Sequence, residues 1–262
     1  MASDSIDAHL ITTDNVGLIE REVRVLVSDG ELPAYQVHPA HGVSFPIVMV
    51  IHEIFGVHEH IKDVCRRLAK LGYLAIAPDL FARWGSISTM SDVGEIMSTV
   101  INRAPDRQVM SDLDALVEWL KKNGTGNIAK LGITGFCWGG RITWLYCAHN
   151  PEIKAGVAWY GRLEGNASEL QPKHPLDVTK QLKVPVLGLY GGVDRSIPLE
   201  SVKRMQEALS AAHNACEIVV YQNAPHAFFA DYRAGYRKAE AADGWRRLRS
   251  WFREHGISPD VV

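Results

Sequence analysis

The sequence predicts an α/β protein whose mostly parallel, doubly wound sheet carries an antiparallel hairpin at its N-terminal end. From Phe45 onward, short β-branched runs alternate with amphipathic stretches of helical periodicity. Most of these runs are apolar throughout, as is typical of parallel strands that helices cover on both faces. Before them, two nearly alternating segments flank a turn, and this pattern predicts the hairpin.

The hairpin strands are expected at Val23–Val27 and Leu32–His38, on either side of the turn Ser28-Asp29-Gly30. Glycine, proline, asparagine or aspartate bounds the later apolar runs, and these residues commonly end strands. The later runs predict further strands at Phe45–His52, Tyr73–Ala77, Ala129–Gly135, Ala155–Tyr160, Val184–Tyr190 and Glu217–Tyr221.

The stretch Asp106–Lys122 repeats apolar residues on one helical face and stops at Asn123-Gly124, so a helix is expected to end there. Similar periodicity predicts helices at Ile61–Leu71, Gly139–Ala148, Leu199–Ala212 and Ala239–His255. The stretch Arg83–Arg103 breaks this rhythm, because it is rich in serine, threonine and methionine and has little periodicity. We expect it to form a cap segment over a site.

The chain has 262 residues, of which 47% are hydrophobic and 22% charged, which is enough apolar material for one large core. We see no internal repeat, low-complexity tract or linker-like change of composition. Residues 21–262 are therefore expected to form a single domain that follows an N-terminal extension, residues 1–20.

Composition also argues against several classes of protein. A net charge of −2 without a block of like charges argues against a nucleic-acid partner. The longest apolar run, Pro46–Ile51, is far shorter than the ~20 residues of a membrane span, and no cleaved signal is evident. The four cysteines are far apart and form no CxxC pair, which favours a reduced, cytoplasmic protein. A monomer or weak homo-oligomer is expected.

One apolar strand runs into the turn Gly135-Phe-Cys137-Trp-Gly139 and then into a helix. This is the nucleophile-elbow pattern, with cysteine where serine is more usual. Glycines on both sides leave room for the sharp turn, and the helix N-terminus favours a thiolate at Cys137. The alternative is an ordinary tight turn with Cys137 as a small buried hydrophobe.

Two more residues of catalytic type follow later strands. Asp194 lies in the loop after the strand that ends at Tyr190, and His226 lies in the loop after the strand that ends at Tyr221. The order Cys137, Asp194, His226, each at the carboxyl end of a strand, is that of the α/β-hydrolase fold. Taken separately, Asp194 could be a turn residue and His226 a surface residue, but their joint order makes coincidence improbable.

An earlier strand stops at His52-Glu53-Ile54. The loop after an early strand supplies one amide of the oxyanion hole in this fold, so the N–H groups of Ile54 and Trp138 are the expected pair. His52-Glu53 resembles the start of a zinc HExxH motif, but Gly56 stands where the second histidine would be needed. The alternative for Glu53 is a residue that caps a turn.

Taken together, five motifs resemble the dienelactone hydrolase (carboxymethylenebutenolidase) family, over most of the chain from Val23 to Phe252. The motifs are His52-Glu53-Ile-Phe-Gly-Val57, Ala77-Pro-Asp-Leu-Phe-Ala-Arg83, Gly135-Phe-Cys137-Trp-Gly-Gly140, Gly192-Val-Asp194 and Ala224-Pro-His226. The glycine-flanked cysteine and the Glu-Ile-Phe-Gly stretch distinguish this family, since the elbow alone identifies only the superfamily.

The resemblance implies a role for each matching residue. Cys137 would be the nucleophile, His226 the base and Asp194 the residue that orients it. Glu53 would take the thiol proton when substrate arrives. Arg83 would pair with Glu53 and help to hold a substrate carboxylate.

The sequence departs from the family pattern just after the catalytic histidine. The family's dienelactone enzymes carry a serine and a second carboxylate-binding arginine there, whereas this chain has Ala227 and Ala230. Arg233 could substitute for that arginine from three residues further on.

The resulting hypothesis is a hydrolase that cleaves a lactone or activated ester through a thioester on Cys137, without a metal or organic cofactor, and a carboxylate-bearing substrate is one candidate. Trp84, Tyr160 and Phe228 are candidate pocket walls, or plain core residues. Two alternatives stay open: a general thiol esterase or thioesterase of small acyl substrates, and a non-catalytic or redox protein with this fold. For redox chemistry, Cys147 lies about 15 Å along the helix from Cys137, too far to form a disulfide.

Overall fold

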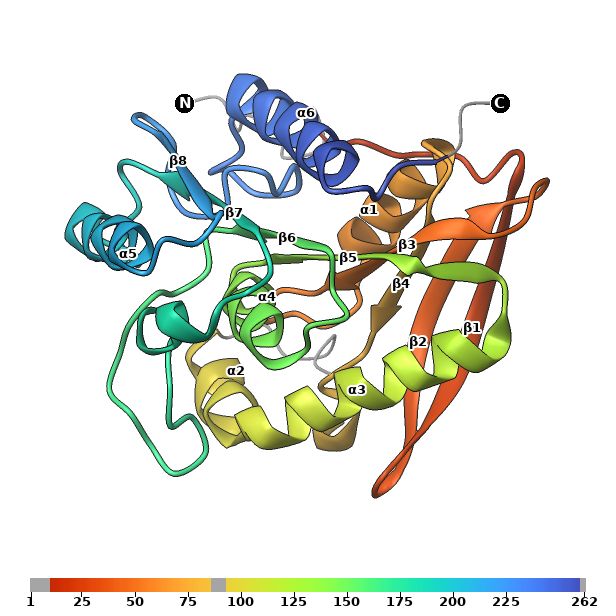
Figure 1. Ribbon diagram of the computed structural model, residues 1–262, viewed down its shortest axis with the longest axis horizontal. Coiled ribbons are helices and arrows are strands. Elements are labelled where there is room, and N and C mark those ends of the chain that lie inside the picture. The colour runs from red at the N-terminus through yellow and green to blue at the C-terminus, as the bar shows by residue number, and fades with distance from the viewer. Residues whose placement is uncertain (1–9, 86–92, 260–262) are drawn as a thin grey trace, which may run out of the picture.

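The computed structural model of the protein describes residues 10–85 and 93–259. Its centre is an eight-stranded sheet with the order β1-β2-β4-β3-β5-β6-β7-β8 (Figure 1). The strands are β1 Leu18–Val27, β2 Gly30–Pro39, β3 Phe45–Ile51, β4 Leu74–Pro78, β5 Gly126–Phe136, β6 Ala155–Trp159, β7 Val186–Gly191 and β8 Glu217–Tyr221. All pairs from β4 to β8 are parallel, whereas β1 and β2 pair antiparallel with each other and β2 pairs antiparallel with β4.

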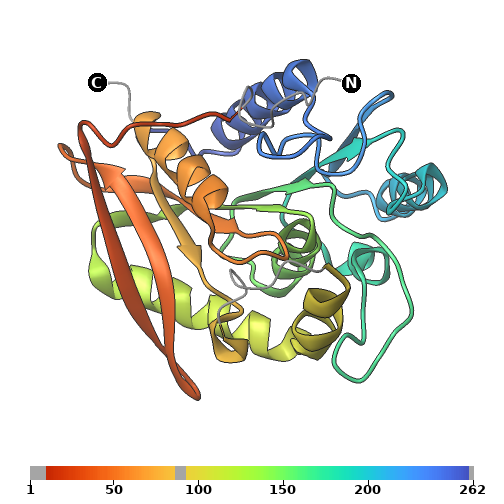
Figure 2. The ribbon, with the colours of Figure 1, turned by 180° about the vertical axis from the view of Figure 1, so that it is seen from behind.

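Helices cover both faces of this sheet. Helices α1 and α6 lie above it in Figure 1, while α3 and α4 lie below, and Figure 2 shows the same layers from behind. The helices are α1 Glu59–Lys70, α2 Val93–Thr99, α3 Asp106–Asn123, α4 Trp138–His149, α5 Leu199–Ala211 and α6 Lys238–Glu254. Short 3₁₀ helices occur at Ala82–Trp84, Ile101–Arg103 and Pro175–Gln181.

This arrangement confirms the α/β-hydrolase fold class, with its mostly parallel sheet and N-terminal hairpin. Strands β3, β4, β6 and β7 are buried along their whole length, which explains why their sequences are apolar at every position. Helix α3 ends at Gly124, whose backbone is left-handed, at the predicted stop.

The hairpin is longer than its apolar pattern predicts. Strand β1 begins at Leu18, inside the segment expected as an extension, and pairs continuously with β2 from Leu18 opposite Pro39 to Val27 opposite Gly30. Its first half is polar and partly exposed, because backbone hydrogen bonds rather than side-chain burial hold it in the sheet.

The expected cap segment is partly described. Residues 86–92 lie outside the described ranges. The remainder forms α2 and the 3₁₀ helix Ile101–Arg103, and both Ile101 and Asn102 line the main cavity. No helix in the described part of the chain is both long and apolar enough to cross a membrane.

A buried ion pair fixes one wall of that cavity. The guanidinium of Arg141, on α4, binds both carboxylate oxygens of Asp106, the first residue of α3, at 2.7 Å each. The same guanidinium donates to the Lys173 carbonyl oxygen at 2.8 Å. The Asp106 N–H donates to the Leu170 carbonyl, so α3, α4 and the loop before Pro175 are joined at one point.

Replacing Asp106 with alanine is expected to destabilise the protein by about 3 kcal/mol, because the Arg141 charge would stay buried without its partner. Urea unfolding of the Asp106→Ala variant measures this loss. Lys121→Ala, which removes surface ion pairs with Glu118 and Glu152, is the matched control and is expected to change little. Equal unfolding midpoints for the two variants would show that the buried pair does not hold this wall.

Candidate active site

The turn between β5 and α4 places Cys137 in a strained backbone conformation, with φ 56° and ψ −113°. Positive φ is costly for a residue with a side chain, and such strain is typical of functional sites. Two glycines allow the turn. A Cβ on Gly135 would lie 2.2 Å from the Gly139 carbonyl oxygen, and a Cβ on Gly139 would lie 2.3 Å from the Ile51 carbonyl oxygen. Any larger residue at either position would force the strands and helix apart.

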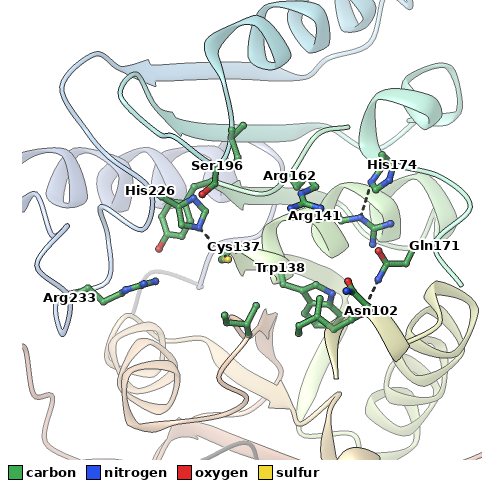
Figure 3. Close-up of a pocket in the computed structure, with 14 residues that line it drawn as sticks. Asn102, Cys137, Trp138, Arg141, Arg162, Gln171, His174, Ser196, His226 and Arg233 are labelled. Carbon is green, nitrogen blue, oxygen red and sulfur yellow. Dashed lines mark hydrogen bonds between the residues drawn. The ribbon is translucent and has the colours of Figure 1, made fainter. Parts of the chain in front are cut away.

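The structure brings the three predicted catalytic side chains together. His226 Nε2 lies 3.3 Å from Cys137 Sγ, as the dashed line in Figure 3 shows. On the other side of the ring, His226 Nδ1 lies 2.7 Å from Asp194 Oδ2. Asp194 is buried, and its Oδ1 accepts hydrogen bonds from the N–H groups of Ser196 and Ile197. The carboxylate is therefore held in place to orient the imidazole.

His226 is strongly basic in this setting. Burial by itself lowers the pKa of the imidazole, but the hydrogen bonds to Asp194 and Cys137 outweigh it and raise the pKa of His226 to about 10. The ring is therefore protonated at neutral pH and faces the sulfur as an imidazolium.

Two backbone amides beside Cys137 are free for a ligand. Ile54 and Trp138 both line the cavity that contains the sulfur. Within the described residues, neither the Ile54 N–H nor the Trp138 N–H donates to a protein acceptor. The predicted oxyanion-hole pair is thus available to an incoming carbonyl oxygen.

Glu53 is buried beside the site but makes no hydrogen bond to Cys137 within the described part of the chain. Its Oε2 accepts a hydrogen bond from the Tyr232 hydroxyl at 2.5 Å and lies 3.7 Å from His58 Nε2. Burial alone would raise the pKa of the carboxyl, but His58, the charge of His60 and the Tyr232 hydroxyl lower it to about 2. Glu53 is therefore held as an anion and is a weak proton acceptor.

Cys137 and His226 line a cavity of about 250 Å³ (Figure 3). Its apolar walls include Ile54, Ile101, Trp138 and Ile197, and no aspartate or glutamate is found among its described lining residues. The polar or ionisable side chains that line it are Asn102, Cys137, Tyr160, Arg141, Arg162, Gln171, His174, Ser196, His226 and Arg233. Tyr160, an expected wall residue, is fully buried and packs edge-on against His226.

The structure contradicts the role expected for Arg83. Its guanidinium binds Asp29 at 2.6 and 2.7 Å and Asp112 at 2.6 and 2.9 Å. It therefore joins the hairpin turn to α3, does not pair with Glu53, and does not line the cavity. Arg233 lines the cavity instead.

Two of the candidate wall residues do not line this cavity. Phe228 is fully buried among Trp159, Tyr160 and Tyr221 and belongs to the core. Trp84 packs on Phe81 and does not line the cavity. The alanines that follow His226 are buried too, so Ala227 and Ala230 bring no polar group to the site.

Several lining residues were not predicted. Arg162 follows β6 by three residues, and its place at the carboxyl end of a strand could have identified it. Asn102 belongs to the segment that was expected to cap a site, although its sequence did not single out this residue, and Gln171 comes from a loop that carries no such pattern. No group of three histidine, cysteine, aspartate or glutamate side chains in residues 10–85 and 93–259 is arranged to hold a metal ion.

The fold and the geometry around Cys137 define a protein of the α/β-hydrolase class. The sequence profile of the dienelactone hydrolase family matches residues 32–256, and the chain belongs to this family. This confirms the resemblance.

Individual relatives agree with the family match. A "Putative carboxymethylenebutenolidase" of Methylorubrum extorquens is 59% identical over 95% of this chain and 85% of its own. A protein of the same name from Salmonella typhimurium is 53% identical over 92% of this chain and 89% of its own. A crystal structure of a "Putative Dienelactone Hydrolase" from Klebsiella pneumoniae has a TM-score of 0.88 and 50% identity, and the match covers 90% of this chain and 99% of that one.

Replacing Asp194 with asparagine is expected to lower the pKa of His226 from about 10 toward its ordinary value, because the carboxylate hydrogen bond raises it. NMR titration of the His226 ring nitrogens in both proteins measures the change. Asp243→Asn, which removes a partly exposed carboxylate on α6 away from the cavity, should leave the titration of His226 unaltered. A midpoint that is the same in Asp194→Asn and the parent would contradict this account of the triad.

Proposed function

We propose that the protein hydrolyses a lactone or an activated ester through a thioester on Cys137. The observation that carries this proposal is the hydrogen-bonded chain from Cys137 through His226 to Asp194, at 3.3 and 2.7 Å, which opens into a cavity beside two free amides. Family membership supports the same class of reaction.

The reaction proceeds in two halves. The Cys137 thiolate attacks the carbonyl carbon, and the amides of Ile54 and Trp138 stabilise the oxyanion. When the carbon–oxygen bond breaks, the His226 imidazolium gives its proton to the departing oxygen. Neutral His226 then takes a proton from water, the resulting hydroxide cleaves the thioester, and the thiolate leaves with the imidazolium re-formed.

We assign the proton transfers to His226 rather than to Glu53. Glu53 has a pKa of about 2 and is bound to Tyr232, so it is poorly suited to remove a thiol proton. Since a thiolate is itself a good leaving group, the chemistry favours enol esters and lactones, whose oxygen departs easily, over amides.

The substrate carries an anionic group, because the cavity wall has cationic side chains and no described carboxylate. Arg233 takes the place that Arg83 was expected to fill. Its guanidinium lies 5.7 Å from the centre of the Phe55 ring and forms no ion pair within the described residues. It is therefore free to bind a substrate carboxylate.

Tyr160 supplies a further hydrogen bond to the reacting group. Its backbone has a positive φ of 38°, its hydroxyl is buried without a hydrogen-bond partner among the described residues, and its ring lies edge-on to His226, 5.2 Å between centroids. Burial raises the pKa of Tyr160, so the phenol remains a donor. An unsatisfied buried hydroxyl is costly, and a substrate oxygen that accepts from it would recover that cost.

Cys137→Ala is expected to abolish ester hydrolysis, because it removes the nucleophile. Steady-state rates of the parent and the variant with p-nitrophenyl acetate, an acyl thioester and an enol lactone measure this loss. The parent rates on the three substrates also show which class of substrate the enzyme prefers. Cys216→Ala, which changes a half-buried thiol on a remote loop, is the control and should retain the parent rate. Full activity in Cys137→Ala would mean that another residue attacks the carbonyl, and a clear preference for the acyl thioester would favour the thioesterase alternative.

Tyr160→Phe is expected to lower kcat about tenfold for esters with poor leaving groups and less for p-nitrophenyl esters, whose departing oxygen needs little stabilisation. A series of aryl esters of increasing phenol pKa measures this dependence. Tyr35→Phe removes the hydroxyl of another buried tyrosine, on β2, which does not line the cavity, and serves as the control. Equal losses across the series would show that Tyr160 does not act on the leaving oxygen.

A further inference from the structure

The cavity has two cationic ends, with the nucleophile between them. Figure 3 shows Arg233 on one side of Cys137 and Arg162 on the other. Both guanidiniums line the same cavity, although they come from segments about 70 residues apart, after β8 and β6 respectively. An elongated ligand that presents its carbonyl to Cys137 would thus meet one arginine at each end.

The charges at the two ends are uncompensated. Of the three arginines that line the cavity, Arg141 is neutralised by its paired contact with Asp106. Arg162 and Arg233 form no ion pair with any described carboxylate, and no described aspartate or glutamate lines the cavity. Two positive groups around a small, partly apolar cavity attract negative groups of a ligand at both ends.

Neutral polar groups accompany Arg162. Asn102 and Gln171 line the same end of the cavity, as Figure 3 shows. The Gln171 amide donates to the Ile101 carbonyl at 2.9 Å, which joins its loop to the segment that carries Asn102. His174, also at this end, has both ring nitrogens occupied, by Arg141 and by the Asn166 carbonyl. Arg162 and the Asn102 carboxamide are the two groups at this end whose side chains make no hydrogen bond to a described residue, so both are available to a ligand.

We propose that Arg162, with Asn102, forms a second carboxylate-binding subsite, so that the preferred substrate is a compact ester or lactone with one carboxylate on each side of the reacting carbonyl. This inference rests on the proposed function and adds a second anionic group to its substrate. A guanidinium binds a carboxylate through two parallel N–H···O bonds, which gives the subsite its selectivity for planar anions. The volume of about 250 Å³ restricts such a substrate to a short spacer.

The test uses four aryl esters: phenyl acetate, the phenyl monoester of succinic acid, 4-acetoxybenzoic acid, and the 4-carboxyphenyl monoester of succinic acid. They carry no carboxylate, one on the acyl side, one on the phenol side, and one on each side. The parent enzyme is expected to have its highest kcat/KM on the dianionic ester. Arg162→Gln should reduce that value about five- to tenfold, a modest factor because the side chain is exposed, and leave phenyl acetate unchanged.

Arg103→Gln is the matched control. Arg103 is exposed and follows Asn102 in the chain, but it does not line the cavity, so its loss removes the same charge without the contact. The subsite is supported if Arg103→Gln keeps the higher kcat/KM on the dianionic ester and Arg162→Gln loses it. The subsite is overturned if the two substitutions lower kcat/KM on the dianionic ester equally. It is also overturned if Arg162→Gln lowers kcat/KM for phenyl acetate as much as for the dianionic ester.

Failure of the second subsite can be distinguished from failure of the proposed role of Cys137. Suppose that Arg233→Gln lowers kcat/KM for both succinate monoesters or for 4-acetoxybenzoic acid, while Arg162→Gln lowers kcat/KM for none of the four esters. The second subsite then fails, and the proposed function stands. If the Cys137→Ala variant hydrolyses all four esters at the parent rate, the proposed function fails instead.

Discussion

The backbone at Cys137 can adopt its positive φ only because Gly135 and Gly139 leave no side chain between β5, α4 and β3. With 2.2 and 2.3 Å from a hypothetical Cβ to backbone oxygens, neither position tolerates even alanine without movement of the sheet. The turn raises the sulfur above the sheet edge and points the first N–H groups of α4 toward it. The remaining parts of the site are arranged around this one point.

Because β5 is central, the loops after β7 and β8 can reach the sulfur from one side and the loop after β3 from the other. The first two loops carry Asp194 and His226, and the third carries Glu53 and Ile54. The hydrogen bonds of His226 to a buried carboxylate and to sulfur outweigh its desolvation, which keeps a positive charge beside the nucleophile. Glu53 remains a separate anion, held by Tyr232.

Sequence reasoning placed the elements well because apolar runs and glycine stops depend on local chemistry. It also predicted that Cys137, Asp194 and His226 lie close together, since parallel topology brings the carboxyl ends of strands to one edge. It failed at Arg83, because the position of this side chain is set by ion pairs with Asp29 and Asp112, two carboxylates that are distant in sequence. The segment that carries Asn102 was expected to cap a site, but its sequence did not single out this residue, and Gln171 was missed because only tertiary packing brings its loop to the cavity.

The central claim is that Cys137 carries the acyl group during turnover and that His226 is needed to release it. The most direct measurement is intact-protein mass spectrometry of His226→Ala after mixing with p-nitrophenyl acetate, followed by peptide mapping of the modified position. The account predicts one slowly cleared acetyl group on the peptide that contains Cys137, together with one equivalent of released p-nitrophenol. An unmodified Cys137, with the acetyl group absent or on another residue, would contradict it.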